Sequence, residues 1–258
     1  LASADTRPLK KAMETTKPRP ATAQWGLFLR NHDELDLGRL SEKQRGAVFA
    51  AFGPEKDMQL YDRGIRRRLA PMLGGDRRRI EMAYSLLFSL PGTPVIRYGD
   101  EIGMGDDLAL PERNCARTPM QWSTEPEGGF TKSGKPVSPV IKDGPYGFQH
   151  VNVAEQRRDP NSLLNWTERM IRMRKEAPEI GWGDFSVVDT GDDGVLALRY
   201  DWRGNSVLIL HNLHAQPAEV TFDPDVGEDG RQLIDIADGA SSEADDKGFH
   251  TVRLDAYG

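Results

Sequence analysis

A short apolar run followed at once by ionisable residues is the part of this sequence best suited to chemistry. Residues 26–29 (Gly-Leu-Phe-Leu) suit a short buried strand, and Arg30, Asn31, His32 and Asp33 follow directly. Unpaired charges are costly at the end of a buried strand, whereas active sites in parallel α/β folds lie at the carboxyl ends of strands. The pattern predicts a carboxylate and an imidazole entering a pocket. A polar turn built on the asparagine and the aspartate is the alternative.

A second predicted strand also ends in carboxylates. Residues 76–90 have the apolar spacing of a helix, residues 93–98 suit a strand, and Asp100 and Glu101 follow soon after. A strand, a helix and a second strand in this order are typical of a parallel sheet. Both polar clusters are therefore expected at the same edge of an α/β sheet.

The remaining predicted elements divide the chain into two parts. Further helices are expected at residues 5–16, 41–52 and 161–176, and a long ordered loop containing aromatic residues at 103–156. Short strands with turns between them follow, which is typical of an antiparallel β-domain. They are predicted at residues 185–188, 195–200, 206–210, 218–222 and 251–254. We predict domains at residues 1–181 and 182–258, with the boundary near residues 181–183.

Composition argues against several partners. The chain has 258 residues and a formal net charge of −6, so nucleic acid is not expected as a partner. Apolar runs are too short for a transmembrane helix, so no membrane association is expected. Cys115 is the one cysteine, which excludes an internal disulfide, fits a cytoplasmic location and offers no structural zinc site. Because the chain opens on Leu1 and stops directly after a predicted strand, we expect a fragment of a longer polypeptide.

Four motifs resemble the C-terminal part of glycoside hydrolase family thirteen, the α-amylase family. Residues 28–33 (Phe-Leu-Arg-Asn-His-Asp) resemble the family's motif after barrel strand seven, and residues 91–104 resemble strand eight with its following loop. Residues 117–122 (Arg-Thr-Pro-Met-Gln-Trp) are similar to the trehalose synthase and oligo-1,6-glucosidase branch, and residues 64–71 favour trehalose synthase. Arg97 departs from this branch, which usually has an aromatic residue there.

The resemblance implies the C-terminal part of a (β/α)8 barrel followed by an antiparallel β-sandwich, truncated at its end. Residues 5–16, 76–90 and 161–176 would be helices six, seven and eight. Residues 26–29 and 95–98 would be strands seven and eight.

The resemblance also implies roles for particular side chains. Asp33 matches the carboxylate that stabilises the transition state, and His32, Arg117 and Glu34 match substrate-binding positions. Asn31, Asp100 and Glu101 are expected to orient neighbouring groups. No cofactor and no metal ligand are expected in this chain; calcium is common in the family, but its ligands lie largely upstream.

The function implied is that of a retaining α-glucoside-active enzyme, most similar to trehalose synthase, which interconverts maltose and trehalose by intramolecular glucosyl transfer. An α-glucosidase or α-amylase that hydrolyses the same bonds is an alternative. A non-catalytic carbohydrate-binding or structural fragment is another, because the nucleophile and acid/base of the family follow strands four and five, outside this sequence. The upstream half of the barrel would be required, so the chain alone is expected to be inactive.

Overall fold

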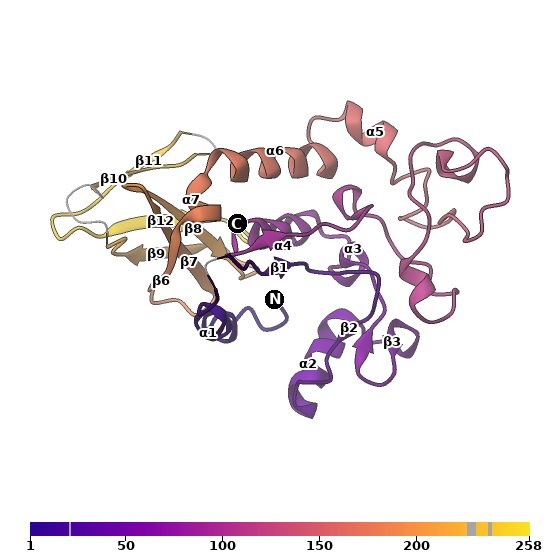
Figure 1. Ribbon diagram of the computed structural model, residues 1–258, viewed down its shortest axis with the longest axis horizontal. Helices are drawn as coiled ribbons and strands as arrows, with labels where there is room; N and C mark the ends of the chain where they lie inside the picture. Colours follow the sequence, from indigo (N-terminus) through magenta and orange to yellow (C-terminus); the bar gives the residue numbers. More distant parts are fainter. Residues whose placement is uncertain (21, 226–230, 237–238) are drawn as a thin grey trace.

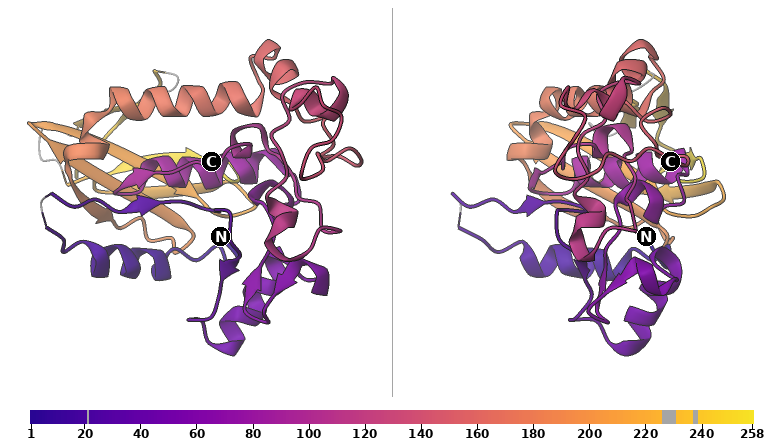
Figure 2. Two further views of the ribbon diagram at one scale, coloured as in Figure 1. Left: turned by 45° about the vertical axis from the view of Figure 1, so that its right-hand side comes forward. Right: turned by 90° about the vertical axis from the view of Figure 1, so that its right-hand side faces the viewer.

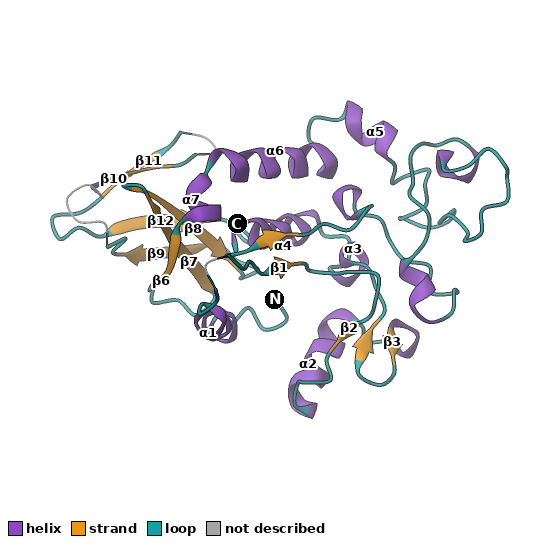
Figure 3. Cartoon of the chain, viewed as in Figure 1, coloured by secondary structure: helices purple, strands orange, loops and turns teal. Residues whose placement is uncertain are grey.

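The computed structural model describes residues 1–20, 22–225, 231–236 and 239–258. Figures 1 and 3 show helices and strands of the N-terminal part packed against a group of antiparallel strands. The α-helices are α1 (Arg7–Thr16), α2 (Glu42–Phe52), α3 (Leu69–Met72), α4 (Arg77–Ser89), α5 (Val153–Arg158), α6 (Leu163–Glu176) and α7 (Pro178–Trp182). Short 3-10 helices are η1 (Lys56–Met58), η2 (Asp100–Ile102), η3 (Glu112–Ala116) and η4 (Pro126–Gly129).

The strands fall into small sheets. In the N-terminal part they are β1 (Gly26–Leu27), β2 (Leu35–Asp36), β3 (Gln59–Leu60), β4 (Gly64–Ile65) and β5 (Thr93–Pro94). In the C-terminal part they are β6 (Asp184–Val188), β7 (Val195–Trp202), β8 (Asn205–Asn212), β9 (Ala218–Phe222), β10 (Gln232–Ile234), β11 (Ser241–Glu243) and β12 (His250–Leu254). The sheet orders are β1-β5, β2-β4-β3, β6-β7-β8, β9-β12 and β10-β11.

The predicted parallel pairing is present, but both strands are shorter than expected. β1 pairs with β5 in parallel, with Gly26 opposite Thr93, and the backbone N–H of Val95 donates to the carbonyl of Leu27 at 2.7 Å. The predictions of strands over residues 26–29 and 93–98 are therefore wrong in extent. A strand persists only where a neighbour satisfies its backbone groups, and the described part of the chain offers no pairing beyond this point.

Helix α4 lies between α6 and α1, as both views in Figure 2 show. The carboxylate of Asp76 caps the helix by accepting from the backbone N–H groups of Arg78 and Arg79 at 3.0 and 3.2 Å. Ile80, Ala83, Tyr84 and Leu87 pack towards Leu163 and Trp166 of α6, and Met82 and Leu86 pack towards Met13 of α1. Helix α4 is thus the shared support of both flanking helices.

Three predicted element boundaries differ from those in the structure, and capping side chains account for two of them, at α5 and α6. Helix α1 begins after Thr6 rather than Asp5, although the Asp5 carboxylate accepts from the Arg7 backbone N–H at 3.0 Å. Helix α6 begins after Ser162, whose hydroxyl accepts from the Asn165 backbone N–H at 3.2 Å. The predicted loop over residues 103–156 also ends early, because the Asn152 side chain caps α5.

The C-terminal strands form a sandwich whose central strand is β7. Its alternating side chains serve two cores: Leu196, Leu198 and Tyr200 pack towards α1 and α4, whereas Val195 and Ala197 pack towards β9 and β12. β6, β7, β8 and β12 are longer than predicted, β9 has the predicted bounds, and β10 and β11 were not predicted. The predicted fold class is confirmed.

The sandwich joins the helices through buried polar contacts. The Tyr200 hydroxyl donates to the carbonyl of Ser89 at 2.6 Å, and the His211 Nε2 atom lies 3.0 Å from the Ser85 hydroxyl. We propose that the domain division lies between residues 181 and 182, in the last turn of α7 and just before β6. Over the part of the chain that the structure describes, no helix is both long and apolar enough to cross a membrane.

Candidate active site

The backbone of the Asp33 segment, a few residues after β1, is held from two sides. The Asn31 side-chain oxygen accepts from the Asp33 backbone N–H at 2.9 Å, and Arg30 Nη2 donates to the Asp33 carbonyl at 2.8 Å. Arg30 is 3% exposed and also donates to the carbonyls of Ile65 and Arg67 at 3.3 and 2.8 Å. Burial lowers the pKa of Arg30 to about 10, so the guanidinium stays charged at neutral pH. The Asp33 backbone is therefore fixed while its carboxylate remains available.

The carboxylate of Asp33 meets two arginines and a histidine. Arg117 Nη2 lies 3.0 Å and Arg113 Nη1 3.5 Å from Oδ1, and His32 Nε2 lies 3.4 Å from Oδ2. Arg117 Nε also donates to the His32 carbonyl at 2.9 Å. The Asp33 side chain is 38% exposed and that of His32 69%. The structure thus brings three predicted site residues together around a carboxylate that a ligand can still reach.

Glu34 is much less exposed than Asp33. Its carboxylate accepts from Arg113 Nε and Nη2 at 2.6 and 3.1 Å, and its side chain is only 7% exposed. The hydrogen bond from Arg113 lowers the pKa of Glu34. A Cβ atom added to Gly64 would lie 2.6 Å from the Glu34 Cγ, so the side chain packs tightly on that glycine. Direct contact of Glu34 with substrate stays a prediction, and this geometry favours a role in orienting Arg113.

Asp100 is more buried than the Asp33 carboxylate, whereas Glu101 is half-buried. Asp100 is 5% exposed and accepts from Arg68 Nη2 at 2.9 Å, and the same arginine nitrogen donates to the Tyr98 carbonyl. Burial raises the pKa of both carboxyl groups, an effect that Arg68 opposes at Asp100. The predicted role of these residues in orienting their neighbours stays a prediction. For Asp100, its burial and the Arg68 contact fit that role.

The sequence alone gave no role to two arginines of this site, Arg113 and Arg30. Arg113 contacts both Asp33 and Glu34, and its position four residues before Arg117 places both side chains on one short loop segment. Arg30 belongs to the polar cluster itself, but its target is backbone rather than ligand. Arg30 adjoins the Asn-His-Asp-Glu stretch in the sequence, whereas Arg113 is 79 positions from Glu34, so only the path of the chain reveals its partners.

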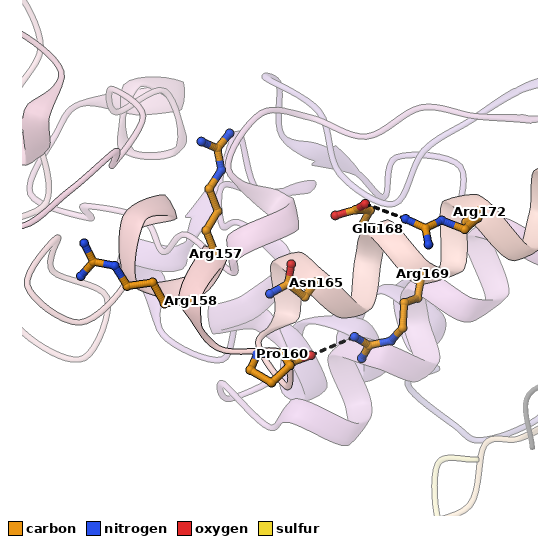
Figure 4. A pocket seen from close by; sticks show the side chains of 7 residues that line it. All are labelled: Arg157, Arg158, Pro160, Asn165, Glu168, Arg169 and Arg172. Atoms are coloured by element: carbon orange, nitrogen blue, oxygen red, sulfur yellow. Dashed lines mark hydrogen bonds and ion pairs between the residues drawn. The ribbon is translucent and has the colours of Figure 1, made fainter.

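A separate hollow of about 310 Å³ lies between α5 and α6 (Figure 4) and is lined by Arg157, Arg158, Pro160, Asn165, Glu168, Arg169 and Arg172. Arg172 pairs with Glu168 at 2.9 Å, and Arg169 donates to the Pro160 carbonyl at 2.8 Å. None of these residues belongs to the Asp33 cluster, so this hollow is not the candidate active site.

Among the described residues, no group of three or more His, Cys, Asp or Glu side chains is arranged to hold a metal ion.

The fold and the motifs define a class of protein. Residues 63–183 match the family model described as "Alpha amylase, catalytic domain", and residues 204–258 match "Sucrose hydrolase-like, C-terminal domain". The chain belongs to the α-amylase family, glycoside hydrolase family thirteen.

The curated relatives that the chain resembles include several trehalose synthases. It is 42% identical over 212 residues to a trehalose synthase of Thermus thermophilus, covering 81% of this chain and 22% of the relative. It is 41% identical over 222 residues to the trehalose synthase of Pimelobacter sp., covering 84% of this chain and 39% of the relative. A trehalose synthase/amylase of Mycolicibacterium smegmatis is 44% identical over 192 residues, covering 74% and 32%. The chain therefore spans less than half the length of these relatives.

Solved structures agree on the fold. An α-amylase from H. orenii matches with a TM-score of 0.68 and 21% identity, over 99% of this chain and 44% of that chain. The trehalulose synthase MutB, in a mutant form complexed with sucrose, matches with a TM-score of 0.63 and 22% identity, over 98% and 45%. At this level of identity the likeness establishes the shared fold.

Proposed function

We propose that this chain forms part of a retaining, trehalose synthase-like enzyme that interconverts maltose and trehalose by intramolecular glucosyl transfer. The observation that carries the proposal is the reachable Asp33 carboxylate, fixed after β1 and flanked by His32 and Arg117. The identity of 41–44% to trehalose synthases supports the choice of reaction.

In this proposal Asp33 acts on charge that develops during the reaction. Cleavage of a glycosidic bond passes through an oxocarbenium-like, positively charged centre. A fixed carboxylate stabilises that centre more than it stabilises the neutral sugar, so the barrier falls. Because Arg30 and Asn31 hold the Asp33 backbone, little reorganisation is needed when the charge appears.

His32 and Arg117 would bind sugar hydroxyls in the same subsite. A neutral sugar offers no charge, so its orientation depends on directed hydrogen bonds. The imidazole of His32 can donate to or accept from a hydroxyl, and Arg117 Nη2 reaches the same carboxylate from the opposite segment. The site is therefore suited to a small α-glucoside.

The remaining chemistry would come from the rest of the enzyme. Retention requires a nucleophile and an acid/base about 5 Å apart, and the family places them after barrel strands four and five. A covalent glucosyl intermediate would form there, and the released glucose would attack it again before water does. The upstream half of the barrel is thus the required partner of this chain, and we propose a cytoplasmic location.

Hydrolysis is the second candidate, and a specific observation favours it. One relative at 44% identity is named a trehalose synthase/amylase, and a relative at 26% identity is an oligo-1,6-glucosidase. Transfer and hydrolysis share the same glucosyl intermediate and differ in whether water reaches it.

The test is to incubate the full-length enzyme with maltose and to measure trehalose and glucose over time. We expect trehalose as the main product, with glucose as the minor one, and the reverse reaction from trehalose. Glucose without trehalose would mean that the enzyme hydrolyses maltose and does not transfer the glucosyl group. Neither product, with a correctly folded full-length protein, would favour the non-catalytic alternative.

A further inference from the structure

Arg97 links the two segments that carry the candidate site. Its Nη1 donates to the carbonyl of Asn31 at 2.9 Å, and its Nη2 donates to the carbonyl of Ala116. Asn31 begins the segment of Asp33, and Ala116 directly precedes Arg117. One planar guanidinium therefore spans two backbones that lie far apart in the sequence.

The two bonds from Arg97 belong to the same seam as the contacts of Arg117. Arg117 Nη2 lies 3.0 Å from the Asp33 carboxylate, and its Nε donates to the His32 carbonyl at 2.9 Å. The seam, defined here as residues 31–33 and 116–117, is thus closed by two guanidinium groups. Arg117 closes it at the exposed surface, and the half-buried Arg97 closes it at the carbonyls of Asn31 and Ala116, the first residue of each segment.

The surroundings of Arg97 show that it braces backbone rather than neutralising a carboxylate. Over the described residues, no carboxylate lies within ion-pair distance of Arg97. Both of its hydrogen-bonded acceptors across the seam are main-chain carbonyls. Its guanidinium also lies 5.2 Å from the centre of the Tyr98 ring. An aromatic side chain at this position could not donate two such bonds.

We propose that Arg97 is a positioning residue that sets the separation between Asp33 and Arg117 and keeps the seam closed to water. The inference rests on the proposed function, in which both residues contact the same sugar. Loss of the brace would loosen the sugar's orientation and admit water to the glucosyl intermediate. Arg97 would then favour transfer over hydrolysis without touching the substrate.

The chain provides a matched control for this inference. Arg174 on α6 is also a half-buried arginine, and it also donates to two backbone carbonyls, those of Phe88 and Gly92. Those acceptors lie at the end of α4 and just before β5, at the other end of the strand from the seam. Arg97→Met and Arg174→Met each remove two carbonyl hydrogen bonds and retain an apolar stem.

The experiment compares the full-length enzyme with its Arg97→Met, Arg97→Lys and Arg174→Met variants. For each, kcat and KM for maltose, the trehalose-to-glucose ratio and the melting temperature are measured. For Arg97→Met we expect a loss of about 10- to 100-fold in kcat/KM, because a displacement of about 1 Å can cost that much, together with a several-fold larger glucose fraction. Arg97→Lys should recover part of the kcat/KM and part of the wild-type product ratio, because its ammonium can still donate hydrogen bonds. The recovery should be incomplete, because an ammonium lacks the planar fork that reaches both carbonyls.

Several outcomes distinguish the inference from a general loss of stability. We expect Arg174→Met to lower the melting temperature while leaving kcat/KM and the product ratio close to wild type. Equal kinetic losses in both Met variants, or an Arg97→Met enzyme with wild-type kinetics and product ratio, would overturn the inference. If the wild-type enzyme forms only glucose, the transferase proposal fails. In that case the role of Arg97 is tested by the KM for hydrolysis and by the Arg117–Asp33 separation in a crystal structure of Arg97→Met. Changes in both relative to wild type would support the role, and wild-type values would overturn it.

Discussion

At the scale of single residues, the candidate site is an aspartate whose carboxylate and backbone carbonyl are bound by arginines. Arg117 and Arg113 approach the same carboxylate oxygen of Asp33, and Arg30 holds its backbone carbonyl. Arginine suits these tasks because its guanidinium stays charged and offers several donors in a fixed plane. Since Arg113 is shared with Glu34, the pull of two cations on Asp33 is reduced. The aspartate can therefore still stabilise a cationic transition state.

Replacing Asp33 by asparagine should separate this role from folding. We expect kcat/KM of the full-length enzyme for maltose to fall on the order of 10³-fold, because the stabilising negative charge is lost. Stability should change by only about 0.5 kcal/mol, as is usual for a partly exposed position. Asp192→Asn is the control, because that carboxylate is also partly exposed and pairs with His214 at 2.9 Å in the sandwich. An Asp33→Asn enzyme with activity near wild type would exclude the proposed role.

At the scale of elements, α4 connects the barrel part to the sandwich. It packs against α1 and α6, and Ser85 of α4 meets His211 of β8 at 3.0 Å. His211 is 1% exposed, and burial lowers its pKa from 6.5 to about 4. The second hydroxyl facing this ring is that of Ser89, at 3.4 Å. A neutral imidazole is thus part of the contact between the two layers.

This contact predicts a loss of stability in acid. Between pH 6.5 and about 4 the unfolded chain binds a proton at His211 and the folded chain does not, so the free energy of unfolding falls as the pH falls. The contribution is roughly 3 kcal/mol and levels off below the folded pKa. Denaturant unfolding of the full-length protein and of His211→Gln at several pH values between 7 and 4 measures it.

The variant should show a shallower decline than wild type over this range, even if it is less stable at pH 7. Circular dichroism at pH 7 serves as the control for its fold. Parallel pH profiles for the two proteins would mean that His211 does not govern the acid response.

At the scale of the whole molecule, the described chain contains one parallel strand pair with large apolar side chains exposed beside it. Trp25 and Phe28 flank β1 and are 47% and 53% exposed, and Val95 and Tyr98 follow β5 and are 49% and 46% exposed. In a closed (β/α)8 barrel every strand has two neighbours. These side chains lie where further strands and helices of such a barrel would pack.

The 258-residue polypeptide by itself should therefore show no glycosidase or transferase turnover. It lacks the family's nucleophile and acid/base, and Asp33 cannot replace them. Incubation of the purified polypeptide with maltose and with a chromogenic α-glucoside, followed by product analysis, checks this. The full-length enzyme is the positive control. Turnover that disappears in Asp33→Asn would contradict the prediction, because it would locate a complete active site within this chain.

Features that depend on local periodicity and local chemistry could be predicted from the sequence alone. The apolar spacing of α4, the N-cap at Asp76 and the bounds of β9 follow from side chains within a few residues of one another. The site segment at residues 30–33 was recognisable because an apolar run ended abruptly in ionisable residues. Strands of two residues, such as β2 to β4, and the hairpin of β10 and β11 gave too short a pattern to be predicted.

The pairs of side chains that meet could be identified only from the folded chain. Arg117 reaches Asp33 across 84 positions, Arg113 reaches Glu34 across 79, and Arg97 reaches the Asn31 carbonyl across 66. Local pattern indicates which face of an element is buried, whereas these pairings depend on the path of the long loop after β5. An arginine in the sequence is equally suited to water, a carboxylate or a carbonyl, and the fold selects its partner by bringing one of them within 3 to 4 Å.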